Sequence, residues 1–310
     1  MEQIVNIILV SGRSALDMAL YTLLPIMIVM LSLMKLLDAK GLLTRVTDLV
    51  APLTQKIGIP GLGVFAALKL SFVSFAAPIA TLNIMDHGGI SNRQLAVTLA
   101  LLLAMSQANV VFPLVAVGLN AQVVLLTSLL GGIAAALLTY YVAGRGLSDV
   151  GNNNQVVHSA TPVQRSVVQI LSEGGMDGMK LVAGMLPLLV LSLCTVTVLR
   201  EVGAIDFLSR TLGPLLNLLG LPAAAVLPLV TKFVAGGTAF VGVTLDMLQQ
   251  GQLTVLEMNR MAGLVMNPFD IVGVALLLAA GPRMQAVVKP ALIGAAGGLL
   301  LRAVLHFWWF

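Results

Sequence analysis

The sequence predicts an all-α integral membrane protein built from two inverted repeats, and three observations support this. Of its 310 residues, 58% are hydrophobic and only 10% are charged, whereas a soluble domain carries about 25% charged residues. The stretch from Gln94 to Gly144 contains no Asp, Glu, Lys or Arg, which is far longer than the roughly 20 residues that one span requires. Glycine and proline also recur at a fixed separation along the chain.

This recurrence indicates an internal duplication. Five Gly or Pro residues of the first half return 162 positions later without a gap, as Pro25 returns at Pro187. The other pairs are Gly41 and Gly203, Pro52 and Pro214, Gly58 and Gly220, and Pro60 and Pro222. Because Gly and Pro mark turns and helix ends, the matches predict the same order of elements in both halves.

The first repeat is expected over residues 1–143. A short apolar lead-in, 1–15, precedes a span over 18–34. Residues 42–57 place their charges on one helical face, as expected of a helix that lies in the membrane interface. A re-entrant hairpin over 61–86, a broken helix over 95–117 and a last span over 122–143 complete this repeat.

A polar linker over 144–176 leads to the second repeat, 177–310. It is expected to contain a span at 181–199, an amphipathic helix at 204–219, a hairpin at 222–249, a broken helix at 253–280 and a last span at 285–310. The chain begins without a basic segment, so no cleaved signal peptide is expected. The single Cys194 excludes an internal disulfide.

The distribution of Lys and Arg decides between two topologies. If 61–86 and 222–249 cross the membrane, the two sides carry six and eight basic residues, which gives no orientation. If both segments are re-entrant, one side carries ten: Lys35, Lys40, Arg45, Lys56, Arg93, Arg145, Arg165, Lys180, Arg283 and Lys289. The other side keeps Arg13, Arg200, Arg210 and Arg302. The bias favours hairpins, with the linker in the cytoplasm and both termini outside it.

Polar residues gather where these helices are interrupted. Breaks and charges at membrane depth are costly and usually mark a pathway or a binding site. The expected solute-binding residues are Lys69, Ser71, Ser74, Gln107, Asn109, Lys232, Gly236, Gly237, Thr238, Asn267 and Asp270. Ser74 and Thr238 are also expected to cap the second half-helix of each hairpin. Oxygens of Ser106, Asn109, Asn267 and Asp270 could hold Na⁺.

Lys69 and Lys232 occupy nearly equivalent positions, one turn before each hairpin tip. Together they would attract an anion, aided by the positive ends of the half-helices that follow. The alternative is that each lysine forms an ion pair within the protein, with Asp86, Asp246 or Asp270. The three histidines are scattered, so no metal site other than Na⁺ is expected.

The order of an amphipathic helix, a Gly-Ile-Pro or Gly-Leu-Pro turn, a broken hairpin and a broken helix resembles the nucleoside-recognition, or Gate, domain. Such domains occur in concentrative nucleoside transporters, in ferrous-iron transporters and in spore maturation proteins. The resemblance implies a solute held between two hairpin tips and two unwound helices, and moved by an elevator-type shift. Those nucleoside transporters place carboxylates in both unwound helices, whereas the first break here, 106–109, has none.

The sequence therefore predicts a secondary transporter of a small polar, anionic solute, driven by Na⁺ or H⁺, in a bacterial inner membrane. Alternatives are a membrane assembly or maturation factor that does not transport, and a nucleoside or divalent-metal permease. No enzyme activity and no cofactor beyond the coupling ion are expected. The expected partners are the lipid bilayer, the solute and a second copy in a homodimer, and no nucleic acid.

Overall fold

The computed structural model describes residues 2–150 and 166–310, and these residues form helices without any strand. Residues 151–165 of the segment expected as a linker, 144–176, lie outside them. Six segments are long and apolar enough to cross a membrane: Val5–Ala39, Asn92–Val115, Ala121–Ala143, Val167–Leu199, Ala223–Gln249 and Val288–Trp309. The described chain is thus an all-helical, multi-pass membrane protein.

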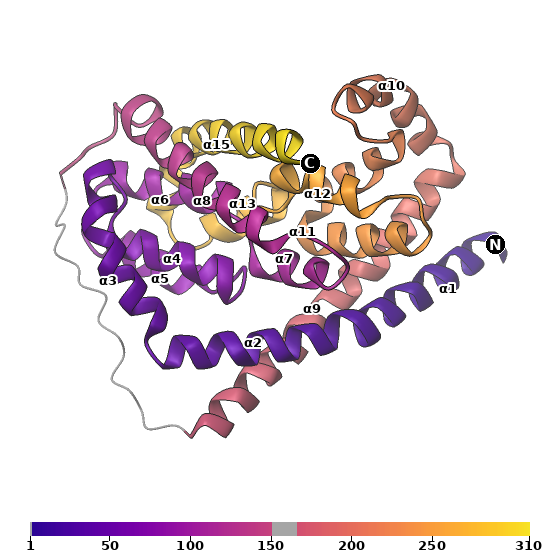
Figure 1. The fold of residues 1–310 in the computed structure, drawn as a ribbon, viewed down its shortest axis with the longest axis horizontal. Helices are drawn as coiled ribbons and strands as arrows, with labels where there is room; N and C mark the ends of the chain where they lie inside the picture. Colours follow the sequence, from indigo (N-terminus) through magenta and orange to yellow (C-terminus); the bar gives the residue numbers. More distant parts are fainter. Residues whose placement is uncertain (1, 151–165) are drawn as a thin grey trace.

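Two long rods cross at one side of the molecule (Figure 1). The first joins α1 (Glu2–Asp17), the π-helix η1 (Met18–Leu23) and α2 (Leu24–Ala39). The second is α9 (Val167–Glu201). Gly174 and Gly178 allow the backbones to approach closely, since a Cβ at Gly178 would lie 2.9 Å from the carbonyl oxygen of Met27. These contacts make the two rods one packed pair.

The rods correct two expectations about the ends of spans. Residues 2–15 are not a separate lead-in but belong to α1, and the helix expected to span 181–199 begins at Val167 and runs to Glu201. The charged ends of the rods pair with each other: Lys35 lies 2.5 Å from Asp177, and the Ser32 hydroxyl donates to the Leu171 carbonyl at 2.8 Å. This ion pair and this hydrogen bond join parts of the two helices that lie beyond the apolar stretches predicted as spans.

The interfacial helices confirm the duplication. They are α3 (Leu42–Thr54), followed by the 3₁₀ turn η2 (Gln55–Ile57), and α10 (Ala204–Leu218). Gly41 and Gly203 precede them with φ of 71° and 73°, and Gly58 and Gly220 follow with 82° and 65°. Left-handed backbone favours glycine. The same backbone conformation at equivalent positions therefore explains why glycine recurs in both halves.

Each half also contains two interrupted elements. Hairpin 1 consists of α4 (Gly61–Phe72) and α5 (Pro78–His87), and broken helix 1 of α6 (Asn92–Ala104) and α7 (Ala108–Val115). Hairpin 2 consists of η4 (Ala223–Ala225) and α11 (Val226–Gln249), which is interrupted at Gly236 with φ 87° and ψ 178°. Broken helix 2 consists of α12 (Val255–Val265) and α13 (Ile271–Leu278).

The remaining helices close around broken helix 1, whose residues 95–104 are all buried. They are α8 (Ala121–Leu138) with the π-turn η3 (Thr139–Ala143), α14 (Pro282–Ala286) and α15 (Val288–Trp309). Glycines bring α8 and α15 together, because a Cβ at Gly131 would lie 2.9 Å from the Gly298 carbonyl oxygen. Such small-residue contacts are typical of helix packing in membranes.

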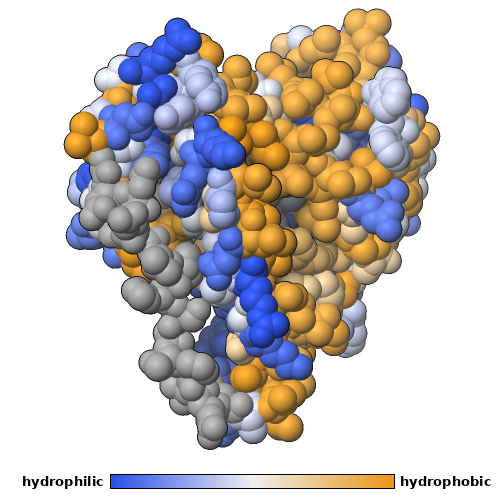
Figure 2. Space-filling view, turned by 60° about the vertical axis from the view of Figure 1, so that its left-hand side comes forward, coloured by the Kyte–Doolittle hydropathy of each residue, from blue (hydrophilic) through white to orange (hydrophobic). Residues whose placement is uncertain are grey.

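The surface agrees with a membrane setting. Figure 2 shows a wide hydrophobic area on one side of the molecule, with hydrophilic residues gathered along the opposite edge. Exposed apolar side chains on the rods and on α15, such as Tyr21, Leu191 and Leu300, contribute to the outer face. Lipid rather than water is the solvent in which such a surface is stable.

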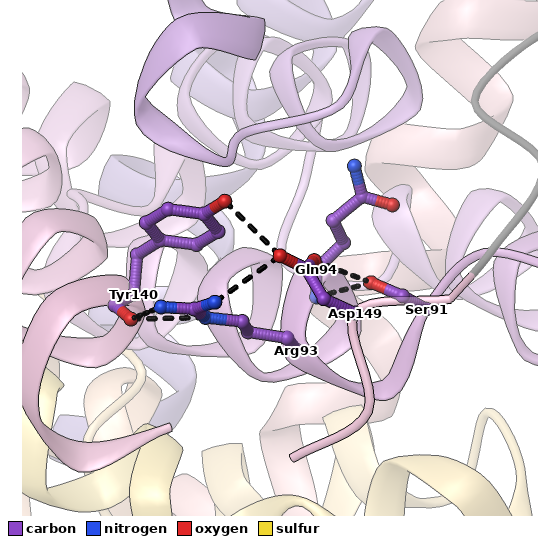
Figure 3. A network of polar contacts seen from close by, with 5 residues as sticks. All are labelled: Ser91, Arg93, Gln94, Tyr140 and Asp149. Atoms are coloured by element: carbon purple, nitrogen blue, oxygen red, sulfur yellow. Dashed lines mark hydrogen bonds and ion pairs between the residues drawn. The ribbon is translucent and has the colours of Figure 1, made fainter. Parts of the chain in front are cut away.

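A polar network holds the start of α6 (Figure 3). Arg93 donates from Nε to the Tyr140 carbonyl at 3.0 Å and from Nη1 to Asp149 at 3.1 Å, and its guanidinium lies 3.9 Å from the centre of the Tyr140 ring. The Tyr140 hydroxyl donates to Asp149, and Ser91 caps α6 by accepting from the Gln94 amide. The π-helix η3 and the start of broken helix 1 are thereby fixed together.

Candidate functional site

Buried hydrogen bonds connect the four interrupted elements. Gln107 at the first break donates from Nε2 to the carbonyl of Asn267 at the second break, at 3.0 Å. Ser71 of hairpin 1 donates to the Ser106 carbonyl at 3.0 Å. Lys232 of hairpin 2 forms an ion pair with Asp270. The two hairpins and the two broken helices therefore meet in one polar region inside an apolar protein.

Break 1 is held from outside its own helix. The chain leaves the α-conformation at Met105 and resumes it at Ala108. The last carbonyl of α6, that of Ala104, accepts from Arg302 Nη1 at 2.6 Å, and the Ser106 hydroxyl accepts from Nη2 at 2.8 Å. The Ser106 amide donates to the Ser128 hydroxyl at 2.7 Å. Side chains of α8 and α15 thus satisfy the backbone that the break exposes.

Sequence reasoning missed Arg302, because its place near the C-terminus suggested a charge at the membrane surface. Its side chain is instead fully buried, with its stem packed over Gly131. Within the described residues it has no carboxylate partner, and its Nε has no hydrogen-bond partner. A cation at a helix C-terminus interacts favourably with the helix dipole. The signal for this role was an arginine in the middle of an apolar stretch of α15, well away from Lys289 at its start.

Break 2 is held by its own residues. Asn267 donates from Nδ2 to the Leu264 carbonyl at 2.7 Å and accepts from the Phe269 amide at 3.0 Å. Asp270 is the N-cap of α13, and its Oδ1 accepts from the Gly273 amide at 2.7 Å. Its Oδ2 pairs with Lys232. The local Asn-Pro-Phe-Asp sequence thus supplies the bonds that end one helix and cap the next, and Gln107 and Lys232 add bonds from other elements.

The structure shows which of the three candidate carboxylates pairs with Lys232. Its side chain is fully buried, and it pairs with Asp270 rather than with Asp86 or Asp246. Asp86 instead accepts from the Met284 amide at 2.9 Å, and Asp246 accepts from Gln250 in its own helix. A buried ion pair thus joins hairpin 2 to the second break.

Lys69 differs from Lys232 in its surroundings. It is only half-buried, its ammonium group lies 4.5 Å from the centre of the Phe65 ring, and no carboxylate of the described residues pairs with it. Cation–π contact of this kind is a modest interaction. The two lysines are equivalent in sequence but differ in their electrostatic environment.

Glycine brings the tip of hairpin 2 close to break 1. A Cβ at Gly237 would collide with the Gln107 amide and would lie 2.7 Å from Val110 Cγ2. Gly236 has the left-handed backbone that favours glycine. The capping expectation for Ser74 is wrong, because α5 begins after Ala77 without a side-chain cap. Thr238 is half-buried, and no side-chain hydrogen bond is recorded for it among the described residues.

Three of the four residues expected to hold Na⁺ already use their side-chain oxygens as hydrogen-bond or ion-pair acceptors. Ser106 accepts from a guanidinium, Asn267 from a backbone amide, and Asp270 from Lys232 and Gly273. Only Asn109 keeps a buried side-chain oxygen without a partner. The described residues contain no cluster of three His, Cys, Asp or Glu that could hold a metal ion. In this conformation, most of the oxygens expected to coordinate Na⁺ already have hydrogen-bond or ion-pair partners within the protein.

Comparison with known families confirms the Gate resemblance. The Gate family, described as nucleoside recognition, matches residues 182–288, which include hairpin 2 and broken helix 2. Spore maturation protein B of Bacillus subtilis (strain 168) is 38% identical over 76 residues. That alignment spans 24% of this chain and 42% of the relative, which is less than half the length of either protein.

Solved structures confirm the fold over almost the whole chain. CNTnw in an inward-facing substrate-bound state has a TM-score of 0.71 and 14% identity, covering 99% of this chain and 82% of that chain. A CNTnw variant in an outward-facing state has a TM-score of 0.69, 14% identity, and coverage of 99% and 83%. The chain thus has the core fold of a concentrative nucleoside transporter, although at this identity the likeness establishes the fold alone.

Proposed function

We propose that the protein is an elevator-type secondary transporter of a small polar, anionic solute, driven by Na⁺ or H⁺. The observation that carries this proposal is the convergence of both hairpins and both breaks on one another. Ser71 bonds to break 1, Lys232 pairs with break 2, and Gln107 joins the two breaks. Broken helices that meet in this way form the solute site of many secondary transporters.

The charges of the region favour an anion over a cation. Lys69, Lys232 and Arg302 lie on the hairpins beside their tips or contact the breaks, and Asp270 is the carboxylate at a break. The other carboxylates of the interrupted elements, Asp86, Asp246 and Glu257, bond to Met284, Gln250 and Thr254 instead. Charged groups within a membrane are expensive and mark substrate pathways by default. An anionic solute would compensate the excess of positive charge.

The crossed rods suggest which parts move. The α1–α2 rod and α9 pack on each other along their lengths, whereas the interrupted elements bond among themselves. In an elevator mechanism the second group would slide past the first with the solute enclosed. We place the protein in a bacterial inner membrane, with the linker 144–176 in the cytoplasm and both termini outside, and we expect no enzyme activity.

Uptake by reconstituted vesicles tests this function. The purified chain in liposomes should accumulate one member of a panel of small organic anions when a Na⁺ or H⁺ gradient is imposed. The Lys232→Met/Asp270→Asn variant is the matched control, because it keeps the net charge and approximate size of the pair. Accumulation of nucleosides alone, or of divalent cations alone, would contradict the anionic solute.

The similarity to spore maturation protein B supports a second candidate, a membrane maturation factor that does not transport. Such a protein would use its fold to hold partner proteins and would leave the Lys232–Asp270 pair permanently closed. It predicts no uptake of any solute class, and it predicts that a variant without the pair still supports the cellular process. The uptake panel separates the two candidates.

A further inference from the structure

The Lys232–Asp270 pair is electrically neutral and enclosed. The exposed fraction of Lys232 is 0% and that of Asp270 is 6%. The two residues lie on different elements, Lys232 on hairpin 2 and Asp270 at the start of α13. Opening hairpin 2 away from broken helix 2 therefore separates two opposite charges.

No other charged side chain of the described residues can replace either partner. Asp270 is the only charged group that interacts with Lys232. The neighbouring charged side chains bond to other groups: Asp86 to Met284, Arg283 to Ile90 and Asn92, Glu257 to Thr254, Arg260 to Gly220 and Phe310, Arg93 to Asp149 and Tyr140, Asp177 to Lys35, and Arg302 to Ala104 and Ser106. A separated pair must find new partners from outside the protein.

Electrostatics then restricts what can enter. An anion that binds Lys232 displaces Asp270 and leaves one buried carboxylate without a counter-charge, which is strongly unfavourable in a low-dielectric interior. A cation that binds Asp270 alone leaves the Lys232 ammonium unpaired for the same reason. Only an anion and a monovalent cation together give each member of the separated pair a new counter-charge.

We infer that the Lys232–Asp270 pair enforces joint binding of one anionic group at Lys232 and one monovalent cation at Asp270. The cation is either Na⁺ or a proton, since both neutralise one carboxylate. Asp270 Oδ1 keeps its bond to the Gly273 amide, and Oδ2 exchanges Lys232 for the cation. The inference rests on the proposed transport function and supplies its coupling rule, one cation for each anionic group.

Single substitutions expose each half of the site without knowledge of the natural solute. Asp270→Asn leaves Lys232 unpaired, so this variant should be stabilised by nitrate, a monoanion that does not titrate in the range used. Lys232→Met leaves Asp270 unpaired, so this variant should be stabilised by Na⁺ or by acidification. The wild type should respond to neither ion alone.

The measurement is the melting temperature of the purified full-length chain. By mass action, each tenfold rise in a saturating ion should raise it by about 2–3 °C in the variant that lacks the opposite charge. Na⁺ is compared with choline at neutral pH, and acidification is performed in choline, so the two arms identify the cation. Asp246→Asn and Lys289→Met are the controls, since they make the same charge changes away from the pair.

Equal ion responses in the wild type, the two variants and the controls would overturn the inference. Each variant tests its own half of the site, and melting can be followed in native membranes if a variant is too unstable to purify. The double variant should fold and respond to neither ion. Failure of uptake with intact ion responses would refute transport, whereas uptake that needs no cation would refute the coupling rule.

Discussion

The two breaks have the same position in the duplicated fold but are stabilised in opposite ways. Break 1 carries no charge of its own, and Arg302 from α15 satisfies its exposed backbone. Break 2 carries its own carboxylate, which caps α13 and is neutralised by Lys232. The duplication kept the shape of the site and changed its electrostatics, so the two halves are expected to contribute differently to binding.

The largest effect should come from separating the charges at break 2. Lys232→Met or Asp270→Asn alone leaves a buried charge without its partner, which should cost about 3–5 kcal/mol of stability. The double variant should recover most of that loss, because it removes both charges. Thermal unfolding of the three variants measures this coupling, and additive effects in the double variant would show that the pair is not a unit.

Arg302→Met should have the next largest effect and should act on break 1. It leaves the Ala104 carbonyl and the Ser106 hydroxyl without their donor, at a cost of about 1–3 kcal/mol for a buried group that loses its partner. Lys cannot donate in the same fork geometry, so Arg302→Lys should restore only part of the stability. If Arg302→Met unfolded at the wild-type temperature, break 1 would not depend on α15.

Gly237→Ala should disturb the contact between the two halves. The added Cβ meets the Gln107 amide and Val110, and overpacking of this kind costs about 1–3 kcal/mol. Gly184→Ala is a suitable control, because a Cβ there meets nothing within 4 Å. Gly237→Ala should also increase the proteolytic or labelling accessibility of the hairpin 2 tip, and unchanged accessibility would argue against tight closure.

Ser71→Ala should have the smallest effect of the series. It removes one neutral hydrogen bond, to the Ser106 carbonyl, which contributes about 1 kcal/mol. Because break 1 retains Arg302 and Ser128, the fold should persist with a small decrease in melting temperature. A loss as large as that of Arg302→Met would mean that hairpin 1 supports the break as strongly as α15 does.

Local sequence predicts most of this architecture. Glycines and prolines that recur at a fixed spacing record the duplication, and the same residues adopt matching left-handed turns, as Gly41 and Gly203 do. The interrupted elements are recognisable because Gly236-Gly237 and Asn267-Pro268 place helix-breaking residues beside polar ones inside apolar segments. These signals lie within single segments, so they need no knowledge of neighbouring helices.

The electrostatic partners could not be predicted in the same way. Arg302 meets Ala104 across 198 positions of the chain, and no local pattern reports such a contact. The choice of Asp270 over Asp86 or Asp246 for Lys232 likewise depends on how hairpin 2 packs against α13. The extent of the rods was missed because Asp177 and Lys35 appear polar in sequence but pair across the helices.

The most direct test of the central claim is a melting-temperature screen of small anions, nucleosides and divalent cations, each with Na⁺, with choline and at acidic pH. The wild type should be stabilised by an anion only when Na⁺ or acid is also present, and the Lys232→Met/Asp270→Asn variant should not respond. Stabilisation of the double variant by the same anion, or of the wild type by nucleosides alone, would contradict a site organised by the Lys232–Asp270 pair.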